Sequence, residues 1–108
     1  MRLLEKKCIP CEGGVPPLTH EQIQPYLVEV PGWEVVENGK KIKKEFRFKD
    51  FREAMAFVNR VAELAESESH HPDIAISYNR VGLALWTHAA GGLTENDFIL
   101  AAKINAIA

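Results

Sequence analysis

The sequence lacks the features of a membrane protein and of a nucleic-acid-binding domain. No apolar run approaches the roughly 18 residues that a membrane-spanning helix requires. The chain has 13 Lys and Arg residues against 15 Asp and Glu residues, a net charge of −2, whereas nucleic-acid-binding domains usually carry a basic excess. The stretch MRLLEKKCIPCEGG also lacks the apolar region of a secretory signal peptide. We therefore expect a cytoplasmic protein that binds neither membranes nor nucleic acid.

Cysteine is scarce, since Cys8 and Cys11 are the only two and form a single CxxC. A structural zinc site usually has four protein ligands, so this pair supplies at most half of one. A thioredoxin-like redox motif would follow a strand and open a helix, but this one lies in a segment rich in Pro and Gly. We expect no metal or redox role here, with a zinc ion shared between subunits or a redox contact as the alternatives.

The 108 residues suit one domain with a single core. Residues 1–18 include KKCIPCEGGVPPL, which is typical of an extended, loop-like leader, and the domain is expected at 19–108. Thr19 and Gln22 fit a helical capping box. Pro25 should make that first helix short or kinked.

The next segment predicts a β-hairpin. Asn38-Gly39 is the strongest sequence signal for a two-residue hairpin turn. In the strand that follows, Ile42, Phe46 and Phe48 share one face, and mainly lysines occupy the other. We interpret the lysine-rich face as solvated, with a nucleic-acid patch as the less favoured alternative because the net charge is negative.

The clearest helix is DFREAMAFVNRVAELAESES, residues 50–69. Asp50 can cap it, with Glu53 at the third helical position. Apolar residues spaced by three and four predict a buried stripe, made of Phe51, Ala54, Met55, Val58, Val61, Ala62 and Ala65. Pro72 disfavours a helical conformation at His71, and Thr94 is expected to cap a last helix.

The expected order of elements is α-β-β-α-β-β-α. Strands that are joined by hairpins form antiparallel sheets, and alternation of apolar with polar residues indicates a sheet that is covered on one face. The predicted fold class is therefore α+β, with a four-stranded antiparallel sheet and three helices packed on one face.

Three of the four histidines surround the second hairpin, HHPDIAISYNRVGLALWTH, residues 70–88. A two-residue turn at 79–80 pairs Tyr78 with Val81 and sets the large apolar residues on one face. The same register sets His71 opposite His88, and the Cβ atoms of directly opposed residues are about 4.5–5.5 Å apart. We expect these two imidazoles to be neighbours at the open end of the hairpin.

His70 lies at the junction of helix and strand. If the helix reaches Ser69, the carboxylate of Glu66 lies one turn earlier, where it can orient the His70 imidazole and stabilise its protonated form. The cluster can be incidental, a three-histidine zinc site or an acid–base catalyst. Adjacent side chains on an extended chain point to opposite faces, which disfavours zinc. Imidazole, with a reference pKa of about 6.5, suits proton transfer at neutral pH.

The segment ESESHHPDIAISYNRVGLALWTHAAGGLTENDF resembles the signature of the pterin-4a-carbinolamine dehydratases: HHP, a Tyr-Asn turn, a Thr-His pair, a glycine and a Leu-Thr-x-x-Asp segment. The similarity runs from Trp33 to the last helix. It implies the same α-β-β-α-β-β-α fold and the dehydration of 4a-hydroxytetrahydrobiopterin to quinonoid dihydropterin and water, in tetrahydrobiopterin recycling. It implies no metal and no bound cofactor, because the pterin is the substrate.

The resemblance also implies site residues. The family's catalytic histidines and glutamate match His70, His71, His88 and Glu66. Its substrate-contacting segments match His70, His71, Pro72, Thr87, His88, Ala89 and Ala90. We assign acid and base roles to His71 and His88, with His70 held by Glu66, and interpret Asp97 mainly as a helix cap or a support behind the site. Ile74 stands where the family often has an aromatic residue.

The same resemblance implies a homodimer or homotetramer, for which exposed edge strands offer a route, and a functional link to an aromatic amino acid hydroxylase. The alternative function is a non-catalytic protein-binding, assembly or coactivator-like dimerisation module on the same fold. Such a module would not need the histidine cluster.

Overall fold

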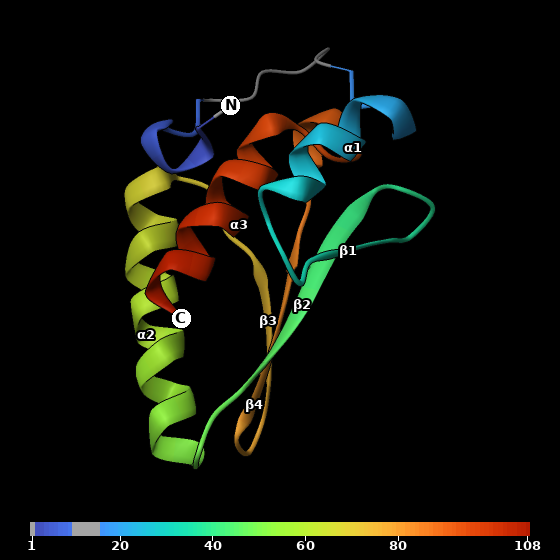
Figure 1. The fold of residues 1–108 in the computed structure, drawn as a ribbon. Helices are drawn as coiled ribbons and strands as arrows, with labels where there is room; N and C mark the ends of the chain where they lie inside the picture. Colours follow the sequence, from blue (N-terminus) through green and yellow to red (C-terminus); the bar gives the residue numbers. More distant parts are fainter. Residues whose placement is uncertain (1, 10–15) are drawn as a thin grey trace.

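The computed structural model describes residues 2–9 and 16–108. Its elements are η1 (Leu3–Glu5), α1 (His20–Val28), β1 (Glu34–Val36), β2 (Lys41–Arg47), α2 (Phe51–Glu68), β3 (Asp73–Ser77), β4 (Arg80–Leu85), η2 (His88–Ala90) and α3 (Glu95–Ile107). The antiparallel sheet has the order β1-β2-β4-β3, and the three α-helices lie on one face of it (Figure 1). The predicted α+β class and element order are confirmed.

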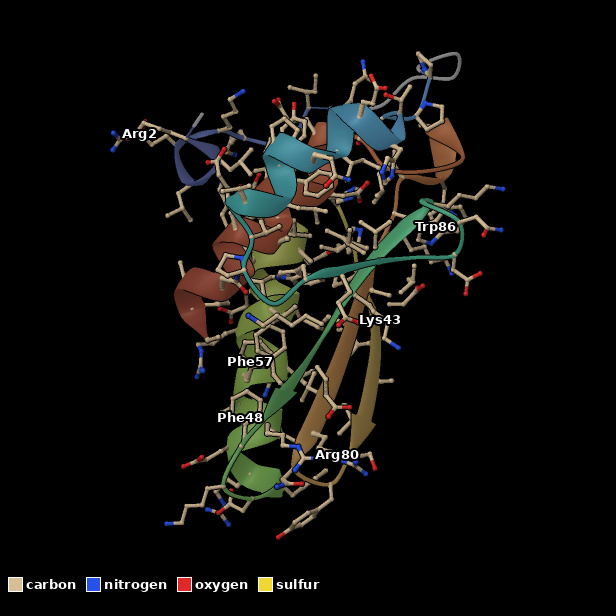
Figure 2. All side chains as sticks on the ribbon, turned by 45° about the vertical axis from the view of Figure 1, so that its right-hand side comes forward. Arg2, Lys43, Phe48, Phe57, Arg80 and Trp86 are labelled. Carbon is tan, nitrogen blue, oxygen red and sulfur yellow. The ribbon has the colours of Figure 1, made fainter. Side chains whose placement is uncertain are left out.

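The core lies between the helices and the two central strands, β2 and β4. Helix α2 buries Ala54, Phe57, Val61 and Ala65. This differs from the predicted stripe, because Phe57 is fully buried while Phe51 is 49% exposed. The Phe57 ring packs against two aromatic rings, those of Phe46 and Phe48, with centroids 4.8 and 5.0 Å away. The sheet therefore selects the face of α2 that carries Phe57, as Figure 2 shows.

All three predicted helix caps form, including Thr94, which is the N-cap of α3 and donates its N–H to Asp97. Thr19 and Gln22 make the full capping box of α1, and the Asp50 side chain accepts a hydrogen bond from the Glu53 N–H at the start of α2. Helix α1 contains Pro25 and has only nine residues. Each cap satisfies backbone N–H groups that the first turn of a helix leaves without partners.

The first hairpin forms with a longer connection than the two-residue turn predicted at Asn38-Gly39. Val36 pairs with Lys41, so the loop spans residues 37–40. Glu37, Asn38 and Gly39 all have positive φ values, of 54°, 55° and 85°. Asn and Gly tolerate that conformation well, so the predicted dipeptide supplies most of the reversal inside a wider loop.

The register predicted for the second hairpin is wrong by two residues. Ile76, not Tyr78, pairs with Val81, and the turn residues are 78–79, with Tyr78 at a φ of 53°. Side chains alternate with a period of two along a strand. A two-residue shift keeps each side chain on its face, so the apolar pattern excludes a one-residue slip but not this one.

Strand β3 is one of the two edge strands of the sheet, and its burial also differs from the prediction. All five of its residues are exposed. Ile74 and Ile76 retain 39% and 41% of their accessible surface, and Tyr78 in the turn retains 65%. The contacts between helices and sheet are concentrated on the central strands, so the helices leave this edge uncovered.

The leader is more structured than the predicted extended loop. It forms one turn of 3-10 helix, η1, which packs against α3, and Leu3 is buried in the core. The prediction for Cys11 falls outside the described residues. Within the described ranges, no helix is both long and apolar enough to cross a membrane.

Candidate active site

The histidines lie where α2, β3, β4 and η2 meet. Helix α2 ends at Glu68, and Ser69 caps it in the left-handed conformation, at a φ of 53°. The His70 N–H then donates to the Ala65 carbonyl oxygen over 3.2 Å. This turn sends the two neighbouring imidazoles in different directions, since the side chains of His70 and His71 are 12% and 60% exposed.

His70 is held by Asp97, not by the predicted Glu66. The His70 Nε2 atom lies 2.6 Å from Asp97 Oδ1. The other carboxylate oxygen of Asp97 accepts hydrogen bonds from the Thr87 hydroxyl, at 2.9 Å, and from the Thr94 N–H, at 3.0 Å. Asp97 is fully buried. It therefore caps α3, as predicted, and is hydrogen-bonded to His70 at the same time.

Glu66 contacts the other histidine of the pair. Its Oε2 atom is hydrogen-bonded to His71 Nε2, and both side chains are largely exposed, at 77% and 60%. The prediction failed because the i−4 relation holds only within a continuous helix, and the left-handed Ser69 intervenes. An exposed pair of this kind contributes little to stability, about 0–1 kcal/mol.

His88 is not directly opposite His71 in the sheet. Continuing the register of β3 and β4 beyond the pair Asp73–Ala84 sets His71 opposite Trp86. His88 instead begins η2, and its ring lies on the indole of Trp86, with centroids 3.9 Å apart. The Lys41 ammonium is 5.2 Å from the centroid of the same indole. Trp86, which the sequence analysis did not single out, thus supports His88.

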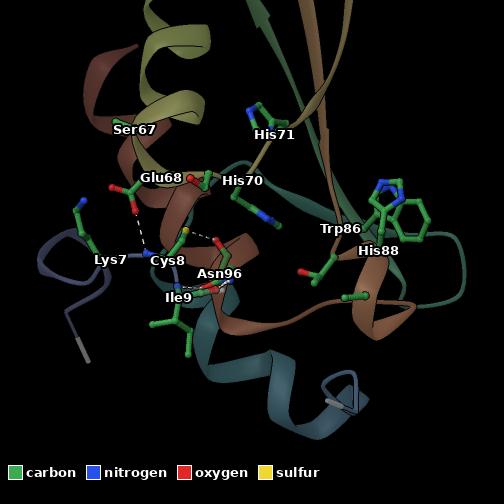
Figure 3. A pocket seen from close by; sticks show the side chains of 13 residues that line it. Lys7, Cys8, Ile9, Ser67, Glu68, His70, His71, Trp86, His88 and Asn96 are labelled. Carbon is green, nitrogen blue, oxygen red and sulfur yellow. Dashed lines mark hydrogen bonds between the residues drawn. The ribbon is translucent and has the colours of Figure 1, made fainter. Parts of the chain in front are cut away.

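All three imidazoles nevertheless line one cavity of about 580 Å³ (Figure 3). The remaining lining residues come from the leader, the end of α2, the end of β4 with η2, and the start of α3: Lys7, Cys8, Ile9, Ser67, Glu68, Ser69, Trp86, Thr87, Ala89 and Asn96. Of the predicted substrate-contacting residues, Pro72 and Ala90 are not part of this lining. Glu66 and Asp97 lie outside this lining and are hydrogen-bonded to His71 and His70.

The leader side of the cavity contains a buried charge pair that sequence reasoning missed. Glu68 accepts from the Cys8 N–H at 2.8 Å and from the Lys103 ammonium at 2.9 Å. Burial favours a higher pKa for Glu68, but the hydrogen bonds from Cys8 and Lys103 outweigh it and hold the pKa below its ordinary value. The sequence contained one signal for this pair: Glu68 lies three residues after Ala65, on the face of α2 that is buried.

Cys8 occupies an environment that favours the thiol. Burial, and then the nearby Glu68 carboxylate, raise its pKa to about 12, whereas metal ligation and redox attack use the thiolate. Among residues 2–9 and 16–108, no three His, Cys, Asp or Glu side chains are grouped so as to hold a metal ion.

Comparison with known proteins identifies the family. The sequence model of the family described as pterin 4 alpha carbinolamine dehydratase matches residues 16–107, so the chain belongs to this family. Relatives named "Putative pterin-4-alpha-carbinolamine dehydratase" occur in Rubrobacter xylanophilus, at 50% identity over 95% of both chains, and in Halorhodospira halophila, at 47% identity over 99% of this chain and 98% of that one.

Two solved structures share the fold. The transcriptional coactivator/pterin dehydratase from Brucella melitensis is 40% identical, with a TM-score of 0.81 over 85% of this chain and 98% of that one. A pterin dehydratase-like protein described as a RuBisCO assembly factor of the alpha-carboxysome has a TM-score of 0.63 over 73% of this chain and 92% of that one. Its identity of 22% supports a likeness of fold alone.

Proposed function

We propose that this protein converts 4a-hydroxytetrahydrobiopterin to quinonoid dihydropterin and water by histidine acid–base catalysis, in tetrahydrobiopterin recycling. The observation that carries the proposal is the convergence of His70, His71 and His88 on one cavity in a chain of the dehydratase family. Imidazole transfers protons in both directions near neutral pH. A cavity with three of them suits a reaction that needs both an acid and a base.

The reaction requires two proton transfers. The 4a oxygen must gain a proton before it leaves as water, and a ring nitrogen must lose one as the new double bond forms. We assign these transfers to His71 and His88, whose rings are the more exposed of the three. His70, fixed by the buried Asp97, orients the pterin and supports charge.

The test follows the decay of freshly generated 4a-hydroxytetrahydrobiopterin by ultraviolet absorbance. The wild type should accelerate the decay. In His71→Ala and in His88→Ala, the catalysed rate should fall by a factor on the order of 10²–10⁴, the usual contribution of general acid–base catalysis. His20→Ala is the matched control, because His20 is exposed on α1 and does not line this cavity.

The pH–rate profiles separate the roles of the histidines. A variant that lacks the general acid should lose the limb of the profile that reports its titration, and a variant that lacks the base should lose the other limb. Equal and small losses for the alanine variants of His70, His71 and His88 would contradict the assignment.

A second candidate function is a protein-binding module, favoured by the exposed apolar residues of the β3 edge, Ile74 and Ile76. The same edge supports self-association into a homodimer or homotetramer, because an unpaired edge strand can pair with another chain. Ile76→Lys should then lower the mass of the assembly in analytical ultracentrifugation. If the wild type does not accelerate pterin decay, capture of partner proteins, including an aromatic amino acid hydroxylase, becomes the next experiment.

A further inference from the structure

The leader forms one wall of the candidate active site although it precedes the region that the family model matches, residues 16–107. Lys7, Cys8 and Ile9 line the same cavity as the three histidines. We propose that this wall binds the side chain at C6 of the pterin, and that the Lys7 ammonium selects pterins whose C6 side chain carries oxygen atoms. The inference rests on the proposed dehydratase function.

The wall is anchored at both ends. Leu3 is buried at 1% exposure, in the η1 turn that packs on α3. At the cavity, Asn96 clamps the backbone of Ile9: its amide nitrogen donates to the Ile9 carbonyl at 2.6 Å, and its oxygen accepts from the Ile9 N–H at 3.0 Å. A segment that is held in this way can position a ligand at low entropic cost.

Cys8, the residue before Ile9, is held by the Glu68 carboxylate, whose charge is neutralised by Lys103. The Cys8 N–H donates to Glu68, whose other oxygen pairs with Lys103 at 2.9 Å, and these two side chains are only 5% and 17% exposed. Glu68 is already paired with Lys103, and Lys7 forms no ion pair within the described residues. In this part of the chain the donors of the exposed Lys7 ammonium are therefore available to a ligand.

The positions of the lining residues determine which end of the cavity the pterin ring occupies. Lys7 and Glu68 lie at one end, and Trp86 and His88 lie at the other (Figure 3). The reacting C4a atom must lie near the imidazoles, so the bicyclic ring fills the histidine end. A substituent on the pyrazine ring then has the leader end available, where hydroxyl oxygens can accept from the Lys7 ammonium.

The test compares two substrates, a 4a-hydroxytetrahydropterin with a 6-methyl group and one with the 6-dihydroxypropyl group. Lys7→Met keeps the length of the side chain and removes the charge. It should lower kcat/KM for the dihydroxypropyl substrate by about 3- to 10-fold, as expected for the loss of one exposed charge-assisted hydrogen bond, and leave the 6-methyl substrate unchanged. Lys49→Met is the control, because Lys49 precedes the start of α2 and does not line the cavity.

Two outcomes contradict the inference in different ways. An active wild type whose ratio of the two kcat/KM values is unchanged by Lys7→Met overturns the role of Lys7 while the dehydratase function stands. A wild type that accelerates neither substrate overturns the proposed function, and the inference falls with it.

Hydrogen exchange tests the wall without turnover. Saturation with oxidised biopterin should slow exchange of the Cys8 and Ile9 amides, since both form the cavity wall. Asn96→Asp, which keeps the size of the side chain but removes its donor to the Ile9 carbonyl, should reduce that effect. A carboxylate at this position in the first turn of α3 is compatible with the helix dipole, so the variant should fold. Bound biopterin that protects the amide of His71 but not those of Cys8 and Ile9 would contradict the inference.

Discussion

The two carboxylate–histidine pairs of the site have the same chemistry but differ in burial and in the number of hydrogen bonds to the carboxylate. The His70 side chain is only 12% exposed, and the carboxylate of Asp97 is fully buried and accepts two further hydrogen bonds. His71 and Glu66 lie in solvent at the rim. A buried, fully hydrogen-bonded network defines one geometry, whereas an exposed pair is screened and mobile. We infer that the inner pair is a scaffold and the outer pair is adaptable.

The largest effect on stability is expected for Asp97→Asn. The substitution removes the charge that accepts from Thr87, Thr94 and His70, and it places amide hydrogens where acceptors are needed. The free energy of unfolding should fall by about 2–3 kcal/mol, the range for breaking a buried polar network.

Urea denaturation at pH 7 measures this loss. Asp50→Asn is the matched control, since Asp50 caps α2 through a single exposed hydrogen bond and Asn is an equally good N-cap residue. Equal losses for both variants would remove the distinction between a buried network and a simple cap.

A pH-dependent effect is expected from the Glu68–Lys103 pair, which extends the buried side of the site. The pKa of Glu68 is lowered in the folded state, so its stabilisation is complete above the pKa of the unfolded chain and is lost as pH falls through the lower folded value. The free energy of unfolding, measured with urea, should therefore differ less between pH 7 and pH 3 for Glu68→Gln than for the wild type. If the two proteins show the same difference in free energy between these pH values, other carboxylates determine the acid sensitivity.

The smallest effect on stability is expected for Glu66→Gln. Both partners of the Glu66–His71 pair are largely exposed, so the free energy of unfolding should change by no more than about 0.5 kcal/mol. The dehydration rate should change more than stability does, because Glu66 orients a proposed acid–base group. A loss of stability as large as that of Asp97→Asn would contradict the comparison between the two pairs.

Several features were predictable because they depend on short stretches of chain. The capping box at Thr19, the Asp50 cap and the chain reversal at Asn38-Gly39 depend on local hydrogen-bonding or dihedral preferences. The two caps occur as predicted, and the reversal occurs within a wider loop. The convergence of the histidines was predicted from a register that is wrong by two residues. The histidines still converge because His88 lies at the start of η2, which places its ring at the same cavity.

Other features depended on contacts between distant segments. Periodicity predicted a stripe on α2 that included Phe51 and omitted Phe57, whereas packing against the sheet buries Phe57 and leaves Phe51 half exposed. The exposure of β3 follows from its place at the sheet edge, which alternation along one strand does not report. The docking of Lys7, Cys8 and Ile9 at the cavity depends on residues 60 to 88 positions away.

The sequence by itself determined the fold class and the order of elements, because periodicity, capping and turn preferences are local properties of the chain. It also placed three histidines at the ends of one hairpin. Only the tertiary structure decided which carboxylate holds which imidazole, which face of α2 is buried, and that the leader lines the cavity. Those outcomes depend on close packing and on the neutralisation of buried charge between segments far apart in the chain, and each requires the three-dimensional positions of both partners.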